Sequence, residues 1–177
     1  MINIVKKYIP KIILLDTLIF VLIFAITQGL LYLFRLSLRR WVVFIFLVLA
    51  TIGGVVGIIQ LLLKIRKKPL KITLLCIFSV LTAAVSFISV PMTIFEFASE
   101  EHIIERDEGR YLARVVGWMD TDVYYYDYVN FLVQGRNIKI EEWDGNGGFD
   151  PFEDDHEHTP RRTIYYDNDG NIMKVDE

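Results

Sequence analysis

The chain has 177 residues, of which 53% are hydrophobic; it is too apolar for an ordinary soluble fold and fits one or two small domains. The net charge of −3 hides two opposite parts: residues 1–95 carry eleven basic and one acidic side chain (+10), and residues 96–177 carry eight basic and twenty-one acidic ones (−13). The acidic second part excludes nucleic-acid binding, and the single cysteine, Cys76, excludes an intramolecular disulfide.

Three apolar segments, residues 12–34, 41–63 and 72–95, predict membrane-spanning helices. Each is longer than the roughly 20 residues that cross about 30 Å of hydrocarbon, and each is apolar on all sides, unlike the core helices of a soluble bundle. The first is too long for the core of a signal peptide and is predicted to be an uncleaved signal anchor. We therefore predict a three-span anchor over residues 1–97, followed by an acidic domain over residues 98–177.

Basic residues near the span ends predict the orientation, because they are retained on the cytoplasmic side. The amino-terminal tail and the second connection hold eight: Lys6, Lys7, Lys11, Lys64, Arg66, Lys67, Lys68 and Lys71. The first connection and the residues after the third span hold six: Arg35, Arg39, Arg40, Arg106, Arg110 and Arg114. This bias predicts a multi-pass protein of a bacterial cell membrane with a cytoplasmic amino terminus and an extracytoplasmic domain. The arginine-rich first connection is the main observation against it.

Small residues four positions apart recur in the spans, where they let helix backbones approach closely. The pairs are Ala25 with Gly29, Gly53 with Gly57, and Ser79 with Ala83. We predict that they pack the three helices against one another. The alternative is a homo-oligomer or docking onto a larger membrane protein.

Asp16 is the only acidic residue inside a predicted span. Ionisable residues inside a membrane are candidates for proton or ion transfer. Asp16 lies near the helix start, however, where the helix dipole and nearby lysines stabilise a carboxylate. This position favours a structural anchor.

The second part of the chain predicts a small antiparallel β-sheet, preceded by a helical extension over residues 96–108. The expected strands cover residues 111–118, 123–133, 138–143, 162–166 and 172–175, with turns at residues 135–137 and 167–171. Asp127 interrupts one face of the second strand, which predicts a bulge or a paired buried carboxylate. Tyr124, Tyr126 and Tyr128 share the other face, where sheet packing is favoured over a platform for a glycan or peptide.

The segment from Asp144 to His158 contains the candidate metal ligands. Asp144, Asn146, Asp150, Glu153, Asp154 and Asp155 offer the hard oxygen ligands that calcium prefers, against the alternative of a solvated acidic loop. Residues 145–153 resemble one nonapeptide of the calcium-binding RTX repeats, G-G-x-G-x-D-x-U-x, with Asn146 in the second position. The resemblance implies calcium chemistry but not the repeat fold, because no second copy follows.

Histidines provide a weaker metal signal. His156 and His158, with Glu153 or Glu157, have the spacing of a zinc site on an extended segment, whereas His102 stands alone beside two glutamates. The sequence contains no nucleophile elbow, phosphate-binding glycine loop or cysteine–histidine pair. We therefore expect a protein that is not an enzyme.

Together these patterns favour a membrane protein that displays an acidic domain to a partner. The partner would be a membrane complex of which the chain is an accessory subunit, or a cationic peptide or toxin against which it gives immunity. The alternatives are a divalent-cation-responsive envelope sensor and an envelope enzyme with an unrecognised site.

Overall fold

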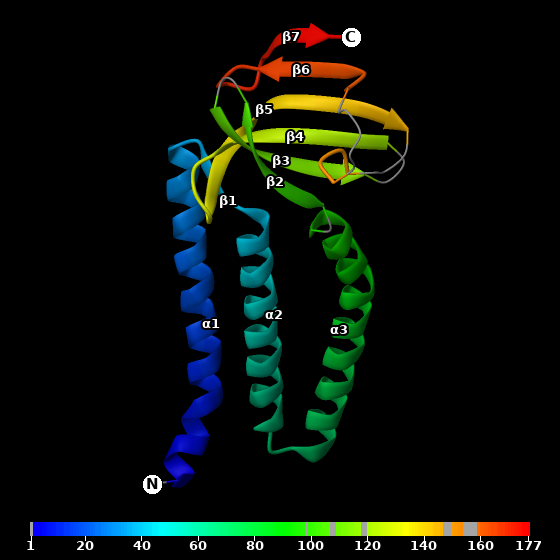
Figure 1. Cartoon of the computed structure of the whole chain (residues 1–177). Coiled ribbons are helices and arrows are strands. Elements are labelled where there is room, and N and C mark those ends of the chain that lie inside the picture. Colours follow the sequence, from blue (N-terminus) through cyan, green and yellow to red (C-terminus); the bar gives the residue numbers. More distant parts are fainter. Residues whose placement is uncertain (1, 98, 107–108, 118–119, 147–149, 154–158) are drawn as a thin grey trace. The chain divides into compact units, whose positions relative to one another are not determined.

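The computed structural model describes residues 2–97, 99–106, 109–117, 120–146, 150–153 and 159–177. It divides into two compact units: a helical unit formed by Met1–Gly29 and Arg40–Phe97, and a sheet unit formed by Leu30–Arg39 and Ala98–Glu177. Three long apolar helices followed by an antiparallel sheet confirm the predicted fold class (Figure 1). Residues Leu30–Arg39, placed with the helices on sequence grounds, belong to the sheet unit.

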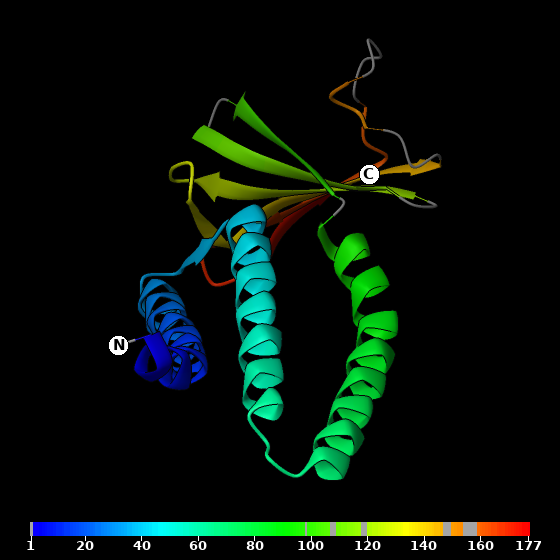
Figure 2. The same cartoon turned by 90° about the horizontal axis from the view of Figure 1, so that it is seen from below.

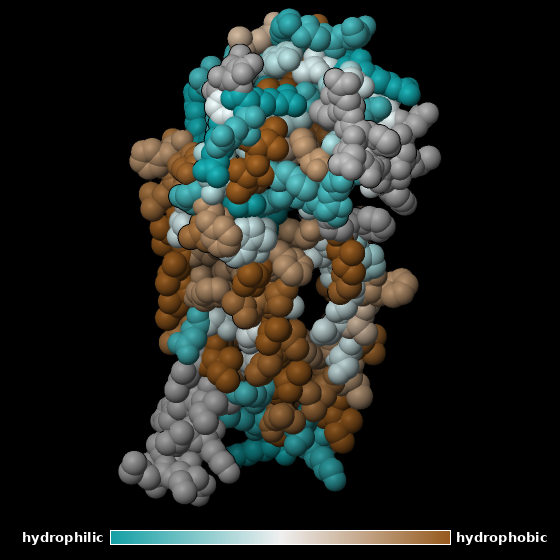
Figure 3. All heavy atoms as spheres, in the orientation of Figure 1, coloured by the Kyte–Doolittle hydropathy of each residue, from teal (hydrophilic) through white to brown (hydrophobic). Residues whose placement is uncertain are grey.

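All three helices are long and apolar enough to cross a membrane: α1 (Ile2–Leu33), α2 (Arg40–Leu63) and α3 (Lys68–Phe97). Their candidate spans have mean hydropathies of 2.2, 2.9 and 2.3. Large side chains such as Phe87 and Met92 are 84% and 70% exposed, an arrangement that suits lipid rather than water. Figure 3 shows hydrophobic side chains gathered over the helices. The chain is therefore built for a lipid membrane.

Helices α1 and α2 approach each other through aromatic rings and two glycines. The ring of Phe46 in α2 stacks on Phe24 of α1, with centroids 3.5 Å apart. A Cβ atom at Gly53 would lie 2.5 Å from Oγ1 of Thr17, and one at Gly57 would lie 3.3 Å from a leucine side chain of α1. The backbone of α2 thus comes close to α1 at both glycines, and a larger residue would force a neighbouring side chain to shift, most of all at Gly53.

Within the described residues the sheet contains seven strands, all paired antiparallel. Six follow one another across the sheet in chain order (Figure 1): β2 (Glu100–Arg106), β3 (Gly109–Gly117), β4 (Asp120–Tyr128), β5 (Val133–Asn146), β6 (Arg162–Tyr166) and β7 (Ile172–Asp176). The seventh, β1 (Leu36–Leu38), pairs with β5. The predicted turn between the last two strands is confirmed by the hydrogen bond from the Asp167 amide to the Asn171 carbonyl.

Strand β1 comes from the connection between α1 and α2, as Figure 2 shows, whereas its partner β5 follows α3. Ser37 is in register with Gln134, and the Arg39 amide donates to the Leu132 carbonyl at 2.9 Å. Residues that pair in one sheet lie on one side of a membrane. A chain that joins the same sheet before α2 and after α3 agrees with two consecutive membrane spans.

Two local expectations were wrong, and a third is confirmed in one of its two alternatives. Residues 100–106 form β2 and not a helical extension, because their alternating side chains pair with β3. The turn between the second and third expected strands falls after Tyr128, where the Asn130 side chain accepts two backbone amides, and Gly135 lies inside β5. The bulge predicted at Asp127 is confirmed by a register shift between Tyr126 and Tyr128, and the alternative of a buried carboxylate is wrong because Asp127 is exposed.

The hydrophobic core of the sheet unit lies on one face, formed by alternate residues of the central strands. Its members are Tyr111, Ala113, Val115, Val123, Tyr125 and Ile140. Phe152, from the segment that follows β5, packs against this cluster. Phe152 therefore anchors this segment on the core face, and Asp150, two residues before it, lies at the same face.

Candidate functional site

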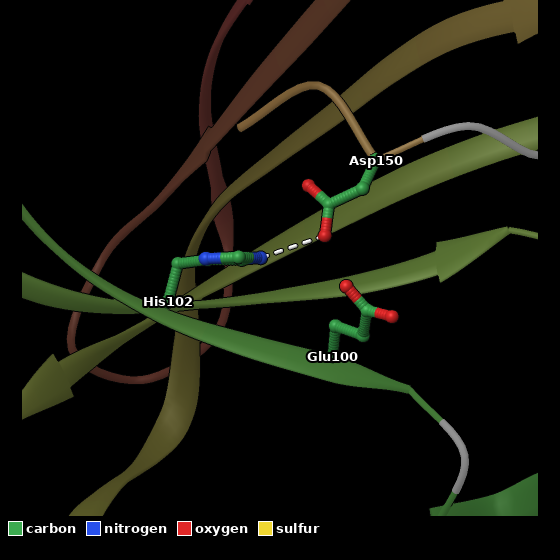
Figure 4. A group of neighbouring side chains, drawn as sticks. All are labelled: Glu100, His102 and Asp150. Atoms are coloured by element: carbon green, nitrogen blue, oxygen red, sulfur yellow. Dashed lines mark hydrogen bonds and ion pairs between the residues drawn. The ribbon is translucent and has the colours of Figure 1, made fainter. Parts of the chain in front are cut away.

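The candidate site contains Glu100, His102 and Asp150 (Figure 4). Glu100 and His102 are two positions apart on β2, so their side chains share a face. They pair with Val115 and Ala113, which belong to the core, so this is the core face of the sheet. Asp150 reaches the same place from the segment after β5, and Figure 4 shows its carboxylate opposite the two β2 side chains.

The three side chains lie close enough together to bind one metal ion. Nε2 of His102 lies 2.7 Å from Oδ2 of Asp150, and one ligand atom from each residue lies within 4.8 Å of the others. The side chains of His102 and Asp150 are 27% and 11% exposed, and Glu100 is exposed. Solvent thus reaches the group from the Glu100 side.

The two carboxylates of the site have opposite pKa shifts. The hydrogen bond with Asp150 raises the pKa of Glu100, and the negative charge of Glu153 adds to the effect. For Asp150, burial favours the neutral acid, but hydrogen bonds from the Phe152 amide, Glu100 and His102 outweigh burial and lower its pKa. Their contact therefore raises the pKa of Glu100 and lowers that of Asp150.

The segment that carries Asp150 is fixed by local contacts. Oδ1 of Asp150 accepts the Phe152 amide at 2.9 Å, and the Asp150 carbonyl accepts the Glu153 amide at 3.2 Å, which together form a compact turn. The Phe152 ring lies 5.0 Å from the imidazole of His102, and Pro151 is buried. The turn therefore leaves Oδ2 of Asp150 directed at His102.

A second polar cluster on the core face joins three strands through Arg106, Tyr125 and Glu142. The Arg106 guanidinium donates to Oε1 and Oε2 of Glu142 at 2.8 and 3.1 Å and to the Tyr125 hydroxyl at 2.9 Å. The Tyr125 hydroxyl donates to Glu142. Burial and the adjoining carboxylate raise the pKa of Tyr125 far above its usual value. These groups satisfy one another and give the cluster a structural role that sequence patterns did not reveal.

The sequence-predicted calcium ligands are only partly described. Asp144 lies in β5, half-buried, and Glu153 is exposed beside the turn. The Asn146 side chain, Asp154 and Asp155 lie outside the described residues, as do His156, Glu157 and His158 of the alternative zinc site. Among the described side chains, the metal-ligand group that forms contains Asp150 with Glu100 and His102 instead. Calcium binding by the longer segment stays a prediction.

The other predicted positions are on the helices and on β4. Asp16, Ala25, Gly29, Ser79 and Ala83 are exposed within the helical unit, unlike Gly53 and Gly57. The rings of Tyr124, Tyr126 and Tyr128 are covered by guanidinium groups of β3, at 5.3 and 5.6 Å from Arg114 and 4.7 Å from Arg110. This arrangement agrees with sheet packing more than with an open aromatic platform.

A cavity of about 610 Å³ opens on the other face of the sheet, and it is lined by Asp122, Glu141, Trp143, Arg161, Arg162, Ile164 and Glu177. Partial burial and the charges of Glu141 and Asp120 raise the pKa of Asp122. The start of β4 therefore brings the carboxylates of Asp120 and Asp122 close to Glu141 of β5, and carboxylates this close together favour a neighbouring cation.

Comparison with models of known protein families, with curated proteins and with solved structures finds no match.

Proposed function

We propose that this chain is a non-enzymatic protein of a bacterial cell membrane that holds an acidic β-sheet domain on the extracytoplasmic side and works by binding a partner. The partner is a membrane complex that takes the chain as an accessory subunit, or a cationic peptide or toxin. One observation carries the proposal: β1, between the first two candidate spans, pairs with β5, which follows the third. The chain thereby enters the sheet unit twice, through β1 and again after α3, which suits a domain displayed on one side of the membrane.

Ion pairs in the first connection support the extracytoplasmic orientation. Arg39 pairs with Glu101 at 2.6 Å and Arg35 with Asp169 at 2.8 Å. Both arginines thus have a structural reason to be on the side of the sheet. Because they have this structural role, they are weaker evidence that the connection between α1 and α2 is cytoplasmic. The eight basic residues of the amino-terminal tail and the second connection then decide the orientation.

The cavity beside Trp143 is the surface that we assign to the partner. Asp122, Glu141 and Glu177 line it beside Arg161 and Arg162. The indole of Trp143 is 37% exposed and has the Arg161 guanidinium 5.9 Å from its ring, a contact of the kind that a lysine or arginine of the partner would make. The net charge of the domain attracts cationic partners over longer distances.

A capture experiment with the tagged full chain, gently solubilised from native membranes, tests this assignment. We expect a co-purified protein with a basic segment, whose yield falls up to about fivefold in Asp122→Asn, the range expected for one partly exposed charge pair. Raising the salt concentration should release it as well.

The matched control is Asp127→Asn, the same change on β4 at an exposed position whose register partner, Tyr111, is on the core face. This variant should keep the full yield. If the yield of the partner falls equally in both variants, or if neither variant nor high salt lowers it, the cavity is not the binding surface.

The alternative of a divalent-cation-responsive envelope sensor is favoured by the Glu100–His102–Asp150 group, because carboxylates and imidazole are metal ligands.

A further inference from the structure

We propose that Glu100, His102 and Asp150 form a binding site for a divalent transition-metal cation of the zinc type, which fastens the segment after β5 to β2. The proposal goes beyond partner binding, because the site lies on the core face of the sheet and the cavity assigned to the partner lies on the other. Either one can fail while the other stands.

The donor atoms decide the class of cation. One imidazole nitrogen and two carboxylates match the ligands that zinc takes at three-ligand sites, where a water completes the coordination. Imidazole nitrogen suits zinc, copper, iron and nickel, whereas calcium prefers six to eight oxygen ligands. The site therefore shares Asp150 with the calcium site that the acidic sequence predicts, but it takes its other two ligands from β2 and differs in metal class.

The backbone arrangement brings the donors together without strain. Glu100 and His102 point the same way because they alternate along β2, and Asp150 is held opposite them by its turn and by Phe152 in the core. Ligand atoms already within 4.8 Å of one another need only small side-chain rotations to reach about 2.0–2.2 Å from a common cation. Two of the donors are therefore fixed by the sheet and the third by the packed turn.

The charges at the site favour a cation over the protein groups alone. Two acidic side chains, Asp150 and Glu100, meet at one imidazole, and Glu153 follows Asp150 by three residues. A divalent cation satisfies both carboxylates at once, in place of the hydrogen bond that they otherwise share. His102 Nε2, which now faces Asp150, binds the cation through its lone pair once its proton has passed to Nδ1 or to water.

Isothermal titration of zinc chloride into the purified full chain, after removal of metals with a chelator, tests the proposal. We expect one zinc ion per chain and a higher midpoint of thermal unfolding, with no comparable response to calcium chloride at equal ionic strength. Glu100→Gln and His102→Gln should each weaken zinc binding by at least about tenfold, since even residues that only orient metal ligands change affinity by that factor.

Glu100→Gln is the decisive variant because Glu100 is exposed and the change removes a like charge beside Asp150, so the metal-free protein should fold at least as stably. Asp127→Asn serves as the control for a lost acidic charge, and His156→Asn with His158→Asn serves as the control for the alternative zinc site in the sequence. Both controls should bind zinc as the unaltered chain does. Absence of zinc binding, equal response to calcium, full affinity in Glu100→Gln, or loss of binding only in the double histidine variant would each overturn the proposal.

Discussion

Glu142→Ala should lower the free energy of unfolding of the sheet unit by about 3 kcal/mol, the lower end of the range for breaking a buried ion pair. The change leaves the Arg106 guanidinium and the fully buried Tyr125 hydroxyl without their shared acceptor, while Glu142 itself is only 3% exposed. The lower end applies because the Arg106 side chain is 31% exposed and can still reach water. Thermal unfolding in detergent, followed by near-ultraviolet circular dichroism, should show a midpoint lowered by about 10 °C or more.

Glu105→Ala is the matched control, because Glu105 is also a glutamate facing an arginine but is 84% exposed and 3.9 Å from Arg110. Exposed pairs of this kind contribute at most about 1 kcal/mol. If both variants unfold at similar temperatures, the Arg106–Tyr125–Glu142 cluster is not what holds β2, β4 and β5 together.

Reversing the charge of Arg39 should detach the first connection from the sheet and cost about 3 kcal/mol. The Arg39 and Glu101 side chains are only 9% and 13% exposed, and two guanidinium nitrogens contact the same carboxylate oxygen. Arg39→Glu would place two carboxylates together there. The double variant Arg39→Glu with Glu101→Arg should recover much of the loss, because the pair is restored in reverse.

A disulfide between the register partners Ser37→Cys and Gln134→Cys, in a Cys76→Ser background, reports whether β1 is in place. Its yield should fall in Arg39→Glu and return in the charge-swapped variant. The control is Arg35→Glu, which disrupts an ion pair in the same segment whose side chains are 61% and 65% exposed. A yield equally low in Arg35→Glu, or no recovery in the swap, would show that the buried pair does not hold β1.

The helices and most strands could be predicted from the sequence, because both depend on local composition. Twenty or more apolar residues in a row have few alternatives to a membrane span, and Arg162–Tyr166 alternates clearly between turn residues. Strand β1 was missed because Leu36–Leu38 is too short for a periodic pattern and its partner lies about a hundred residues away.

The candidate site was missed for a related reason. Residues 96–108 were predicted to be helical, and residues two apart do not share a face of a helix, so Glu100 and His102 were not considered together. The same two-residue spacing predicts a zinc site at His156 and His158, because an extended segment is expected there. Had β2 been recognised, the Glu-x-His pattern would have been the signal. Asp150 could not have been added, because its approach depends on how the segment after β5 folds back onto the core.

The most direct test of the central claim, a sheet domain held outside the membrane by three spans, is labelling of single cysteines in intact cells with a membrane-impermeant maleimide. Asp169→Cys is at an exposed turn of the sheet unit, and Lys67→Cys is exposed between α2 and α3. In a Cys76→Ser background, the account predicts that Asp169→Cys is labelled in intact cells and Lys67→Cys only after permeabilisation. Labelling of Lys67→Cys in intact cells, with Asp169→Cys protected until permeabilisation, would contradict it.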